Sequence, residues 1–418
     1  MSFSRRKLLT ASSALLAATA LPNRARAAAA GDLKFIFVMS YGGWDPTRVF
    51  ATTFDNQAVD MEDRAELSEV GGLSYVSHTD RPSVDSFLSR YADQAMILNG
   101  LLVPSVAHTN CLKLAMTGTS SDASSDWPAI LAAAQADRYP LPHLVVEGPS
   151  YPGDLGSAVT RTGSSGQLEA LLSGEIIDWS DTPASRPETR AEDTLDRYLE
   201  RRISAASSSA AYDRKRAMLS DYGIAHEQAI ALKDLRYVIN WSADGAFYSN
   251  IRLGVSALSM GISRCITLAF ATASDWDTHV ENDEHQSELF EGLFSGLIDL
   301  MDLLNNTTGT TMPTMADETV VVVLSEMGRT PRLNLDLGKD HWPYTSALLL
   351  GPGINSGRVI GGFDDYYYGH LINPATGEQS ATGVEASSAS LGAALLQLGS
   401  VDPGGWLPGV TPLTAILR

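Results

Sequence analysis

A continuous apolar run late in the chain most constrains the fold. Residues Val320–Leu324 are all aliphatic, and such a run is typical of a strand buried on both faces of a parallel sheet. It ends at Ser325 and Glu326, and Asp340 and His341 follow about one loop later. Because ligands of open α/β sheets lie beyond the carboxyl ends of the strands, this pattern predicts a functional site, and the carboxylates and imidazole predict a metal site.

Apolar runs recur through the chain with a helical pattern between several of them. Residues Gln286–Leu304 carry leucines at helical spacing, and the alternation predicts a mainly parallel sheet with helices on both faces. Residues 185–238 are rich in Ala, Glu, Arg and Leu and show no strand pattern, so we expect a helical insertion there rather than a second domain. Residues 157–166 have loop composition. The other predicted strands are Phe35–Met39, Ala95–Leu98, Leu144–Val146, Cys265–Phe270 and Ala347–Leu350.

The first 27 residues have the composition of an export signal. Arg5 and Arg6 open the segment, a diluted apolar stretch runs to Leu21, and Ala25-Arg26-Ala27 provides small residues for cleavage. The paired arginines favour the twin-arginine translocase as the export partner. A membrane anchor is the alternative, but the apolar stretch is shorter than the roughly 20 residues that span a bilayer. We therefore expect a periplasmic or secreted protein with no stable membrane span in its mature form.

The charge balance excludes some partners. The formal net charge of the 418-residue chain is −19, and residues 1–27 hold five basic and no acidic residues, so the mature chain carries −24. Bulk electrostatics then oppose binding to nucleic acid or to an anionic membrane. An anionic substrate needs local positive charge, which a metal can supply. The two cysteines, Cys111 and Cys265, lie in apolar surroundings and are predicted to be buried free thiols, although export would permit a disulfide.

Candidate metal ligands follow several predicted strands. Asp45 follows the first strand after two glycines, Asp277 and His279 follow Cys265–Phe270, and Glu326, Asp340 and His341 follow Val320–Leu324. Their convergence at one sheet edge suits one or two divalent ions such as Zn, Mn, Mg or Ca. Each has a simpler reading. A single Asp after a strand is more often a helix cap or a turn residue, and Glu326 with Arg329 could form a surface ion pair.

These motifs resemble the bacterial family known as domain of unknown function 1501, a branch of the alkaline phosphatase-like and sulfatase-like superfamily. The family's Ser-Glu-Phe-Gly-Arg-Thr-Pro, Gly-Arg-Asp-His-Trp-Pro and Gly-Trp-Asp-Thr-His motifs are similar to Ser325–Pro331, Gly338–Pro343 and Asp275–His279. Its early Gly-Gly-Trp-Asp matches Gly42–Asp45. The resemblance covers nearly all of residues 33–418. It implies one alkaline phosphatase-like αβα sandwich over residues 31–418, with metal held by Asp45, Asp277, His279, Glu326, Asp340 and His341.

The attacking group is less clearly marked than the metal ligands. In sulfatases of the superfamily, a Thr-Gly pair closes the helix that begins at the nucleophile. Thr117-Gly118 is similar to that pair and places His108 nine residues earlier, with Thr109 next. His108 could be a metal ligand, a nucleophile or the base for Thr109. Cys111 lacks the following Pro-Ser-Arg that formylglycine formation requires, which argues against a sulfatase of that type.

Two functions therefore remain open. The first is an exported, metal-dependent hydrolase of phosphate or sulfate esters, acting on a small molecule or a glycan, with His108 or Thr109 as the catalytic group. Arg329 or Lys339 would bind the substrate's anionic group. The second is a non-catalytic, sulfatase-like exported protein that binds a metal or an anionic glycan. Fold analogy names no substrate for either.

The export signal makes a direct prediction. Replacing both Arg5 and Arg6 by lysine should leave the precursor in the cytoplasm, because the twin-arginine route reads the paired arginines. Fractionation followed by immunoblotting measures the distribution. Mature protein in the periplasm of a strain that lacks the twin-arginine translocase would show that the routing is wrong.

Overall fold

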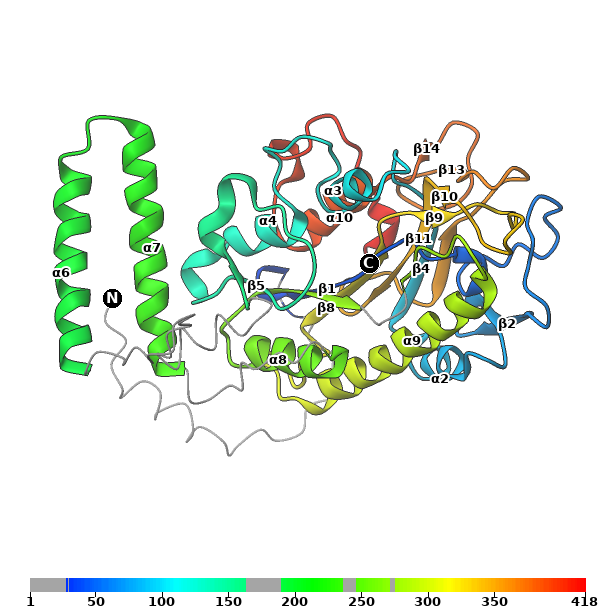
Figure 1. Cartoon of the computed structure of the whole chain (residues 1–418), viewed down its shortest axis with the longest axis horizontal. Coiled ribbons are helices and arrows are strands. Elements are labelled where there is room, and N and C mark those ends of the chain that lie inside the picture. The colour runs from blue at the N-terminus through cyan, green and yellow to red at the C-terminus, as the bar shows by residue number, and fades with distance from the viewer. Residues whose placement is uncertain (1–27, 29, 163–188, 236–245, 271–274) are drawn as a thin grey trace.

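The computed structural model describes residues 28, 30–162, 189–235, 246–270 and 275–418. The predicted signal segment, residues 1–27, lies outside the described residues. Within the residues that the structure describes, no helix is long and apolar enough to cross a membrane. Figure 1 shows a sheet covered by helices, with a pair of helices standing to one side.

The centre of the molecule is a sheet of eight strands in the order β12-β4-β11-β8-β1-β7-β5-β6. Neighbouring strands run parallel except at β11, which is antiparallel to both β4 and β8. The predicted mainly parallel sheet is therefore confirmed. The strands span β1 Lys34–Ser40, β4 Ala95–Leu102, β5 His143–Val145, β6 Val159–Arg161, β7 Cys265–Phe270, β8 Thr319–Ser325, β11 Tyr344–Leu350 and β12 Arg358–Gly361.

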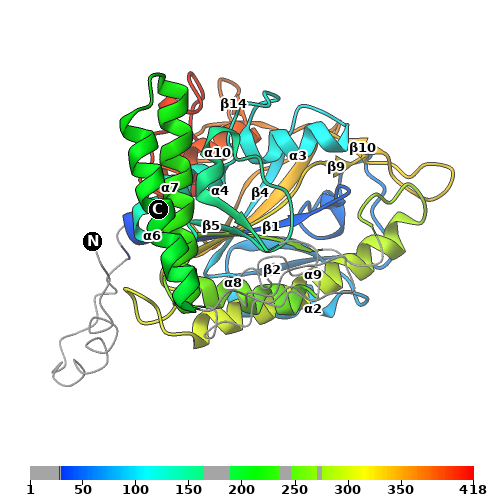
Figure 2. The ribbon, with the colours of Figure 1, turned by 60° about the vertical axis from the view of Figure 1, so that its left-hand side comes forward.

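Helices cover both faces of this sheet, and Figure 2 shows the two layers above and below it. Helices α2 (Pro82–Tyr91), α8 (Phe247–Ser259) and α9 (Asn282–Asn306) share one hydrophobic core with one face. Helices α3 (His108–Thr117), α4 (Trp127–Ala133) and α10 (Ser388–Leu398) share the second core with the other face. Because a strand's side chains alternate between faces, the strands β1, β7 and β8 contribute residues to both cores. The predicted αβα arrangement is confirmed.

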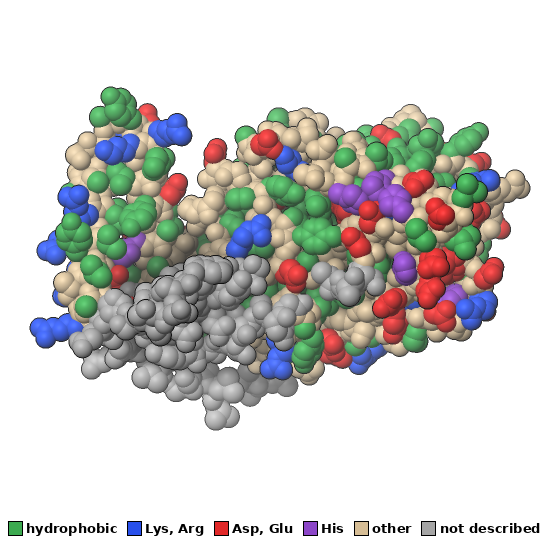
Figure 3. Space-filling view, viewed as in Figure 1, with side chains coloured by type: hydrophobic (Ala, Val, Ile, Leu, Met, Phe, Trp, Pro, Cys, Tyr) green, Lys and Arg blue, Asp and Glu red, His purple; other side chains and the backbone are tan. Residues whose placement is uncertain are grey.

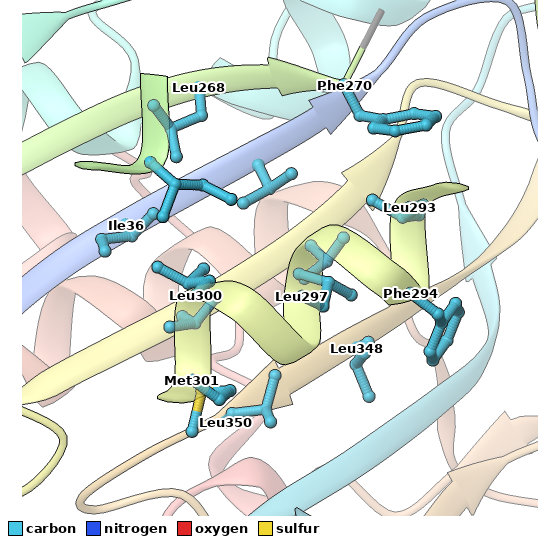
Figure 4. Packing of buried hydrophobic residues seen from close by; sticks show 14 of the residues in the cluster. Ile36, Leu268, Phe270, Leu293, Phe294, Leu297, Leu300, Met301, Leu348 and Leu350 are labelled. Atoms are coloured by element: carbon cyan, nitrogen blue, oxygen red, sulfur yellow. The ribbon is translucent and has the colours of Figure 1, made fainter. Parts of the chain in front are cut away.

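Local sequence explains the principal elements. The leucine stripe predicted in Gln286–Leu304 lies inside α9, where Leu293, Leu297 and Leu300 are buried against the sheet (Figure 4). At the start of α10, Ser387 and Ser390 form a reciprocal capping box that satisfies free helix donors. Helix α3 ends at Gly118, whose φ of 69° is the left-handed conformation that glycine adopts without strain.

Smaller elements surround the sandwich. The loop expected over residues 157–166 is wrong in part, because β6 forms there as an edge strand. Helices α6 (Thr189–Ser208) and α7 (Asp213–Leu235) occupy the described part of residues 185–238. Two-stranded ribbons are β2 (Glu66–Val70) with β3 (Leu73–Ser77), β9 (Gly328–Arg329) with β10 (His341–Trp342), and β13 (Leu371–Ile372) with β14 (Val384–Glu385). Short 3-10 helices span η1 Ala30–Asp32, η2 Pro46–Arg48, η3 Ala136–Arg138, η4 Gly153–Ala158, η5 Pro403–Gly405 and η6 Thr414–Ile416.

Both cysteines are buried free thiols, as predicted. Cys265 lies at the start of β7 and is fully buried, and burial raises the pKa of its thiol to about 12. Cys111 lies in α3, and burial raises its pKa as well. Because the thiolate is the reactive form of cysteine, neither residue is activated as a nucleophile.

His143 is a buried titratable group at the start of β5. Its Nε2 lies 2.8 Å from Thr267 Oγ1, and its Nδ1 has no hydrogen-bond partner in the described part of the chain. Burial lowers the pKa of His143 to about 3. In an unfolded chain the same imidazole has a pKa of about 6.5.

This difference predicts a loss of stability in acid. Below about pH 6.5 the unfolded chain binds a proton at His143 that the folded chain rejects, so folded stability falls as the pH drops towards 3. His143→Gln removes the titration and keeps a polar group near Nε2. Between pH 7 and 4.5 we expect its free energy of unfolding to fall by about 2–3 kcal/mol less than that of the wild type. Urea unfolding at several pH values measures the free energies of unfolding of the wild type and of His143→Gln. If both fall equally steeply as the pH drops, the prediction is wrong.

Candidate metal centre

The topology brings four chain segments to one edge of the sheet. Strands β1, β4, β7 and β8 are mutually parallel, so their carboxyl ends share that edge. Helix α3 follows β4, Asp277 follows β7, and Glu326 follows β8. Because β11 runs antiparallel, the short strand β10 that precedes it lies at this same edge and delivers His341. Figure 3 shows histidine side chains gathered beside acidic ones on this part of the surface.

Three imidazoles surround the carboxylate of Asp277. His341 Nε2 and His279 Nε2 each lie 3.0 Å from Asp277 Oδ1, and they lie 3.1 Å from each other. His108 Nε2 lies 3.4 Å from Asp277 Oδ2 and makes no hydrogen bond within the described residues. His108, Asp277 and His341 offer ligand atoms that all lie within 4.8 Å of one another.

The opposite nitrogen of each ring is held by a hydrogen-bond acceptor. His341 Nδ1 lies 2.7 Å from the backbone oxygen of Val106, and His279 Nδ1 lies 3.0 Å from Asp340 Oδ1. His108 Nδ1 lies 2.9 Å from Glu326 Oε1. These oxygens accept, so each Nδ1 donates to its partner, and in the neutral form of a ring held this way the lone pair lies on Nε2.

In that neutral form the three Nε2 lone pairs face Asp277, and a divalent cation among them would offset their repulsion. Metal-binding histidines characteristically donate the opposite N–H to a carboxylate or a backbone oxygen, which is the pattern of His108, His279 and His341. Nitrogen and carboxylate ligands at zinc distances in a tetrahedron lie about 3.3 Å apart, close to the separations here. His108, Asp277 and His341, whose ligand atoms lie mutually close, therefore form a donor set that fits a divalent cation.

Glu326 is placed differently from the other predicted ligands. It is buried directly after β8, and its Oε1 accepts a hydrogen bond from the backbone N–H of Gly42 at 2.8 Å. The same oxygen holds His108, and this hydrogen bond raises the pKa of the imidazole although burial opposes it. Glu326 therefore orients His108. Asp340 has the same relation to His279.

Arg329 lies beneath the cluster and is fully buried. Its guanidinium donates to the backbone oxygens of Gly42, Gly43 and Lys339, and Nη2 contacts Asp277 Oδ1 at 2.5 Å. Burial would raise the pKa of Asp277, but hydrogen bonds from Arg329 and His341 outweigh it and lower the pKa to about 2. Arg329 was predicted to bind substrate, but in the structure all of its hydrogen bonds serve the protein.

Asp45 and Lys339 lie apart from the histidines. Lys339 Nζ contacts Asp45 Oδ2 at 2.7 Å, and both side chains are fully buried. Asp45 also caps η2 through Thr47 and pairs with Arg48. Burial would raise the pKa of Asp45, but Lys339 and Arg48 hold it well below its usual range. Burial lowers the pKa of Lys339 to about 8. The structure thus does not bring Asp45 to the predicted metal site or Lys339 to its surface.

The start of α3 faces this edge of the sheet. His108 is its first residue and Thr109 the next, and Thr109 is exposed. Ala107 provides no side-chain cap, and the backbone N–H groups of the first turn have no partner in the part of the chain that the structure describes. A helix N-terminus with free donors favours a bound anion. The structure therefore places His108 in the cluster, and Thr109 follows it in the chain at the start of α3.

Sequence reasoning missed the acceptor that holds His341. The backbone oxygen of Val106 could not be identified from residue type, because every residue carries one. The roles of Glu326 and Asp340 as partners of histidines were also not foreseen. The only signal for these two residues in the sequence was that they lie, together with histidines, in segments that follow predicted strands.

The fold and cluster define an α/β protein with a histidine-rich candidate metal site at the carboxyl edge of its sheet. The family model described as a protein of unknown function, DUF1501, matches residues 157–379. This match spans more than half of the chain, so the chain belongs to the DUF1501 family. No curated protein matches the sequence.

Solved structures of low sequence identity align over most of the chain. One is Ps i-CgsB in complex with k-i-k-neocarrahexaose, at 9% identity over 90% of this chain and 74% of that chain, with a TM-score of 0.38. A TAB5 alkaline phosphatase variant with Mg bound in its M3 site aligns at 9% identity over 88% and 99%, with a TM-score of 0.38. The phosphonate monoester hydrolase from Silicibacter pomeroyi aligns at 12% identity over 91% and 77%, with a TM-score of 0.33. At these scores the likeness carries no argument about this chain's activity.

The geometry predicts which side chains govern metal affinity. His341→Ala removes an Nε2 atom that would coordinate the metal, and it should abolish stoichiometric Zn²⁺ binding. Asp340→Asn disturbs only the orientation of His279 and should weaken binding by about 10–100-fold. Calorimetric titration of chelator-treated protein measures both affinities, and elemental analysis gives the stoichiometry.

His370→Ala provides the matched control, because His370 forms no part of the cluster. Its Zn²⁺ affinity should equal that of the wild type. Wild-type protein that binds no divalent ion, or a His341→Ala variant that binds it as tightly as the wild type, would contradict the assignment.

Proposed function

We propose that this protein is an exported, metal-dependent hydrolase of phosphate or sulfate esters. The observation that carries the proposal is the convergence of three imidazole Nε2 atoms on Asp277, immediately beside the N-terminus of α3. The candidate cation site at the histidines then adjoins a candidate anion site at the start of α3. A phosphate or sulfate ester could contact both at once. His108, His279, His341 and Asp277 are the proposed ligands, with Zn²⁺ the ion best suited to this donor set.

A divalent ion held by these residues would polarise the ester and stabilise the charge that develops on its oxygens. The chain itself positions the ligands. Glu326, Asp340 and the Val106 oxygen each accept a hydrogen bond from an Nδ1, which favours the ring form that presents its Nε2 lone pair to a bound metal. Arg329 keeps Asp277 ionised and turned towards the histidines.

The N-terminus of α3 supplies the anion-binding part of the site. The free N–H groups of Thr109 and Asn110 bind the non-bridging oxygens of the ester, since Arg329 and Lys339 are occupied inside the protein. Thr109 is the exposed hydroxyl at this position and is our proposed nucleophile. As its Oγ1 bonds to the phosphorus or sulfur, its proton would pass to solvent and the ester's alcohol would leave, and water would then hydrolyse the intermediate. His108, whose Nδ1 is committed to Glu326, acts through Nε2 as a ligand rather than as the attacking group.

Export through the twin-arginine translocase is part of the same proposal and rests on Arg5 and Arg6. The route carries folded cargo, as the resemblance of residues 1–27 to a twin-arginine signal implies, so the metal can be loaded before export. The natural substrate would be an ester, free or on a glycan, that reaches the periplasm or the cell exterior.

Two observations favour the non-catalytic alternative. No hydrogen bond joins Thr109 Oγ1 to a base among the described residues, and Arg329 and Lys339 are both buried. A site of this kind would still bind a metal and an anionic glycan, because neither requires an activated hydroxyl.

Turnover by a defined set of variants separates the two functions. Zn²⁺-loaded wild type should hydrolyse at least one member of a panel of aryl phosphate monoesters, diesters and aryl sulfates. His341→Ala should abolish turnover. Thr109→Ala should lower kcat by at least about a thousandfold if Thr109 attacks, and rapid quenching of the wild type should trap a covalent phosphoryl or sulfuryl intermediate that Thr109→Ala lacks. Thr109→Ser should retain part of the rate.

Thr119→Ala is the matched control, since Thr119 lies beyond the end of α3. Its turnover should equal that of the wild type. A metal-loaded protein inactive on the whole panel would favour the binding protein, and unaltered turnover in Thr109→Ala would show that Thr109 is not the nucleophile.

A further inference from the structure

The end of the helical hairpin carries a charge opposite to that of the chain as a whole. Residues 201–218, here called the hairpin tip, include the end of α6, the connection and the start of α7. They contain five basic residues and a single acidic one, Asp213, and acidic residues resume on either side at Glu200 and Asp221, although the chain as a whole is strongly acidic. The basic residues are Arg201, Arg202, Arg214, Lys215 and Arg216.

These basic side chains are exposed and largely unpaired. All five lie at the surface, and within the described ranges only Arg216 forms an ion pair, with Asp213. The guanidinium of Arg201 donates to a backbone oxygen of its own helix. Their charge therefore faces solvent.

Large apolar side chains are interleaved with the basic ones. Tyr212 is 76% exposed and Met218 is 64% exposed, and Tyr222 on the next turn of α7 is 53% exposed. A pair of helices can bury only the stripe that each presents to the other, as Ile203 does against Gly223. The outer apolar residues of this hairpin have no covering layer in the described structure.

The tip lies at the free end of the hairpin, which stands beside the sandwich (Figure 1). Asp213 is the first residue of α7 and Met218 lies five residues further on, which is about 8 Å along the helix axis. This length is comparable to the depth to which apolar side chains enter a bilayer surface. At a bilayer surface, apolar side chains enter about 5–10 Å deep while basic side chains remain among the headgroups. Tyrosine is also enriched at that boundary.

We infer that the hairpin tip binds an anionic phospholipid surface and holds the exported protein at a membrane without crossing it. The segregated positive charge supplies the attraction, at about 1 kcal/mol per basic side chain, and Tyr212 and Met218 supply apolar contact. The acidic sandwich opposes this only over short range, because salt screens charges beyond about 8 Å at physiological ionic strength. The negative net charge opposes binding of the molecule as a whole to an anionic membrane, but the hairpin tip is locally positive.

Vesicle binding by the mature chain tests the inference. It should sediment with vesicles of phosphatidylcholine and phosphatidylglycerol in equal parts, but not with pure phosphatidylcholine, and high salt should weaken binding. Arg214→Glu with Lys215→Glu should lower the partition coefficient by about tenfold or more. Acidic residues suit the first turn of a helix, so α7 should still form. Tyr212→Ser with Met218→Ser should also weaken binding.

The matched control changes the net charge equally at a distant site. Arg64→Glu with Arg90→Glu replaces two exposed basic residues outside the hairpin and should bind as the wild type does. Equal loss in this control would overturn the inference, because net charge alone would explain binding. No binding of the wild type to anionic vesicles would overturn it as well. So would a dimer that the tip substitutions dissociate, since a second copy would then be the partner.

Discussion

The buried guanidinium of Arg329 is the interaction on which the candidate site depends. It ties the loop after β1 to the segment before β10 through backbone oxygens, and it fixes Asp277 from below. A buried arginine that lost these acceptors would keep its charge without compensation, which is costly. Three chain segments far apart in sequence are therefore held at one place, and the three imidazoles meet above it.

The hydrogen-bond partners of the histidines decide which ring nitrogen is available to the site. Each ring could exist in either tautomer, but an acceptor at Nδ1 leaves only the Nε2 lone pair for the site. Glu326, Asp340 and a backbone oxygen provide those acceptors. Glu326 and Asp340, which the sequence presents as ligands, instead contact the Nδ1 atoms of His108 and His279 and limit the rotation of these rings.

Charge is distributed unevenly over the molecule, and this links the site to the hairpin. Buried pairs such as Lys339 with Asp45 neutralise charges inside the sandwich, whereas the basic residues of the hairpin tip remain exposed. An acidic protein can in this way offer two separate points of attraction for anions, one at the start of α3 beside the histidines and one at the tip of α7. Each acts locally because solvent screens the rest.

The sequence by itself predicted the sheet and the edge at which the site lies, since aliphatic runs such as Val320–Leu324 are typical of buried central strands. It also placed Asp277, His279 and His341 in segments that follow predicted strands, where ligands of such sheets lie, whereas His108 was indicated only by the family resemblance. Only the tertiary structure decided what each polar group does there. Asp45 also follows a strand, yet a buried lysine and arginine engage it, while Glu326 turns to His108. Residue type fixes what a side chain can bind, but its neighbours in space decide what it does bind.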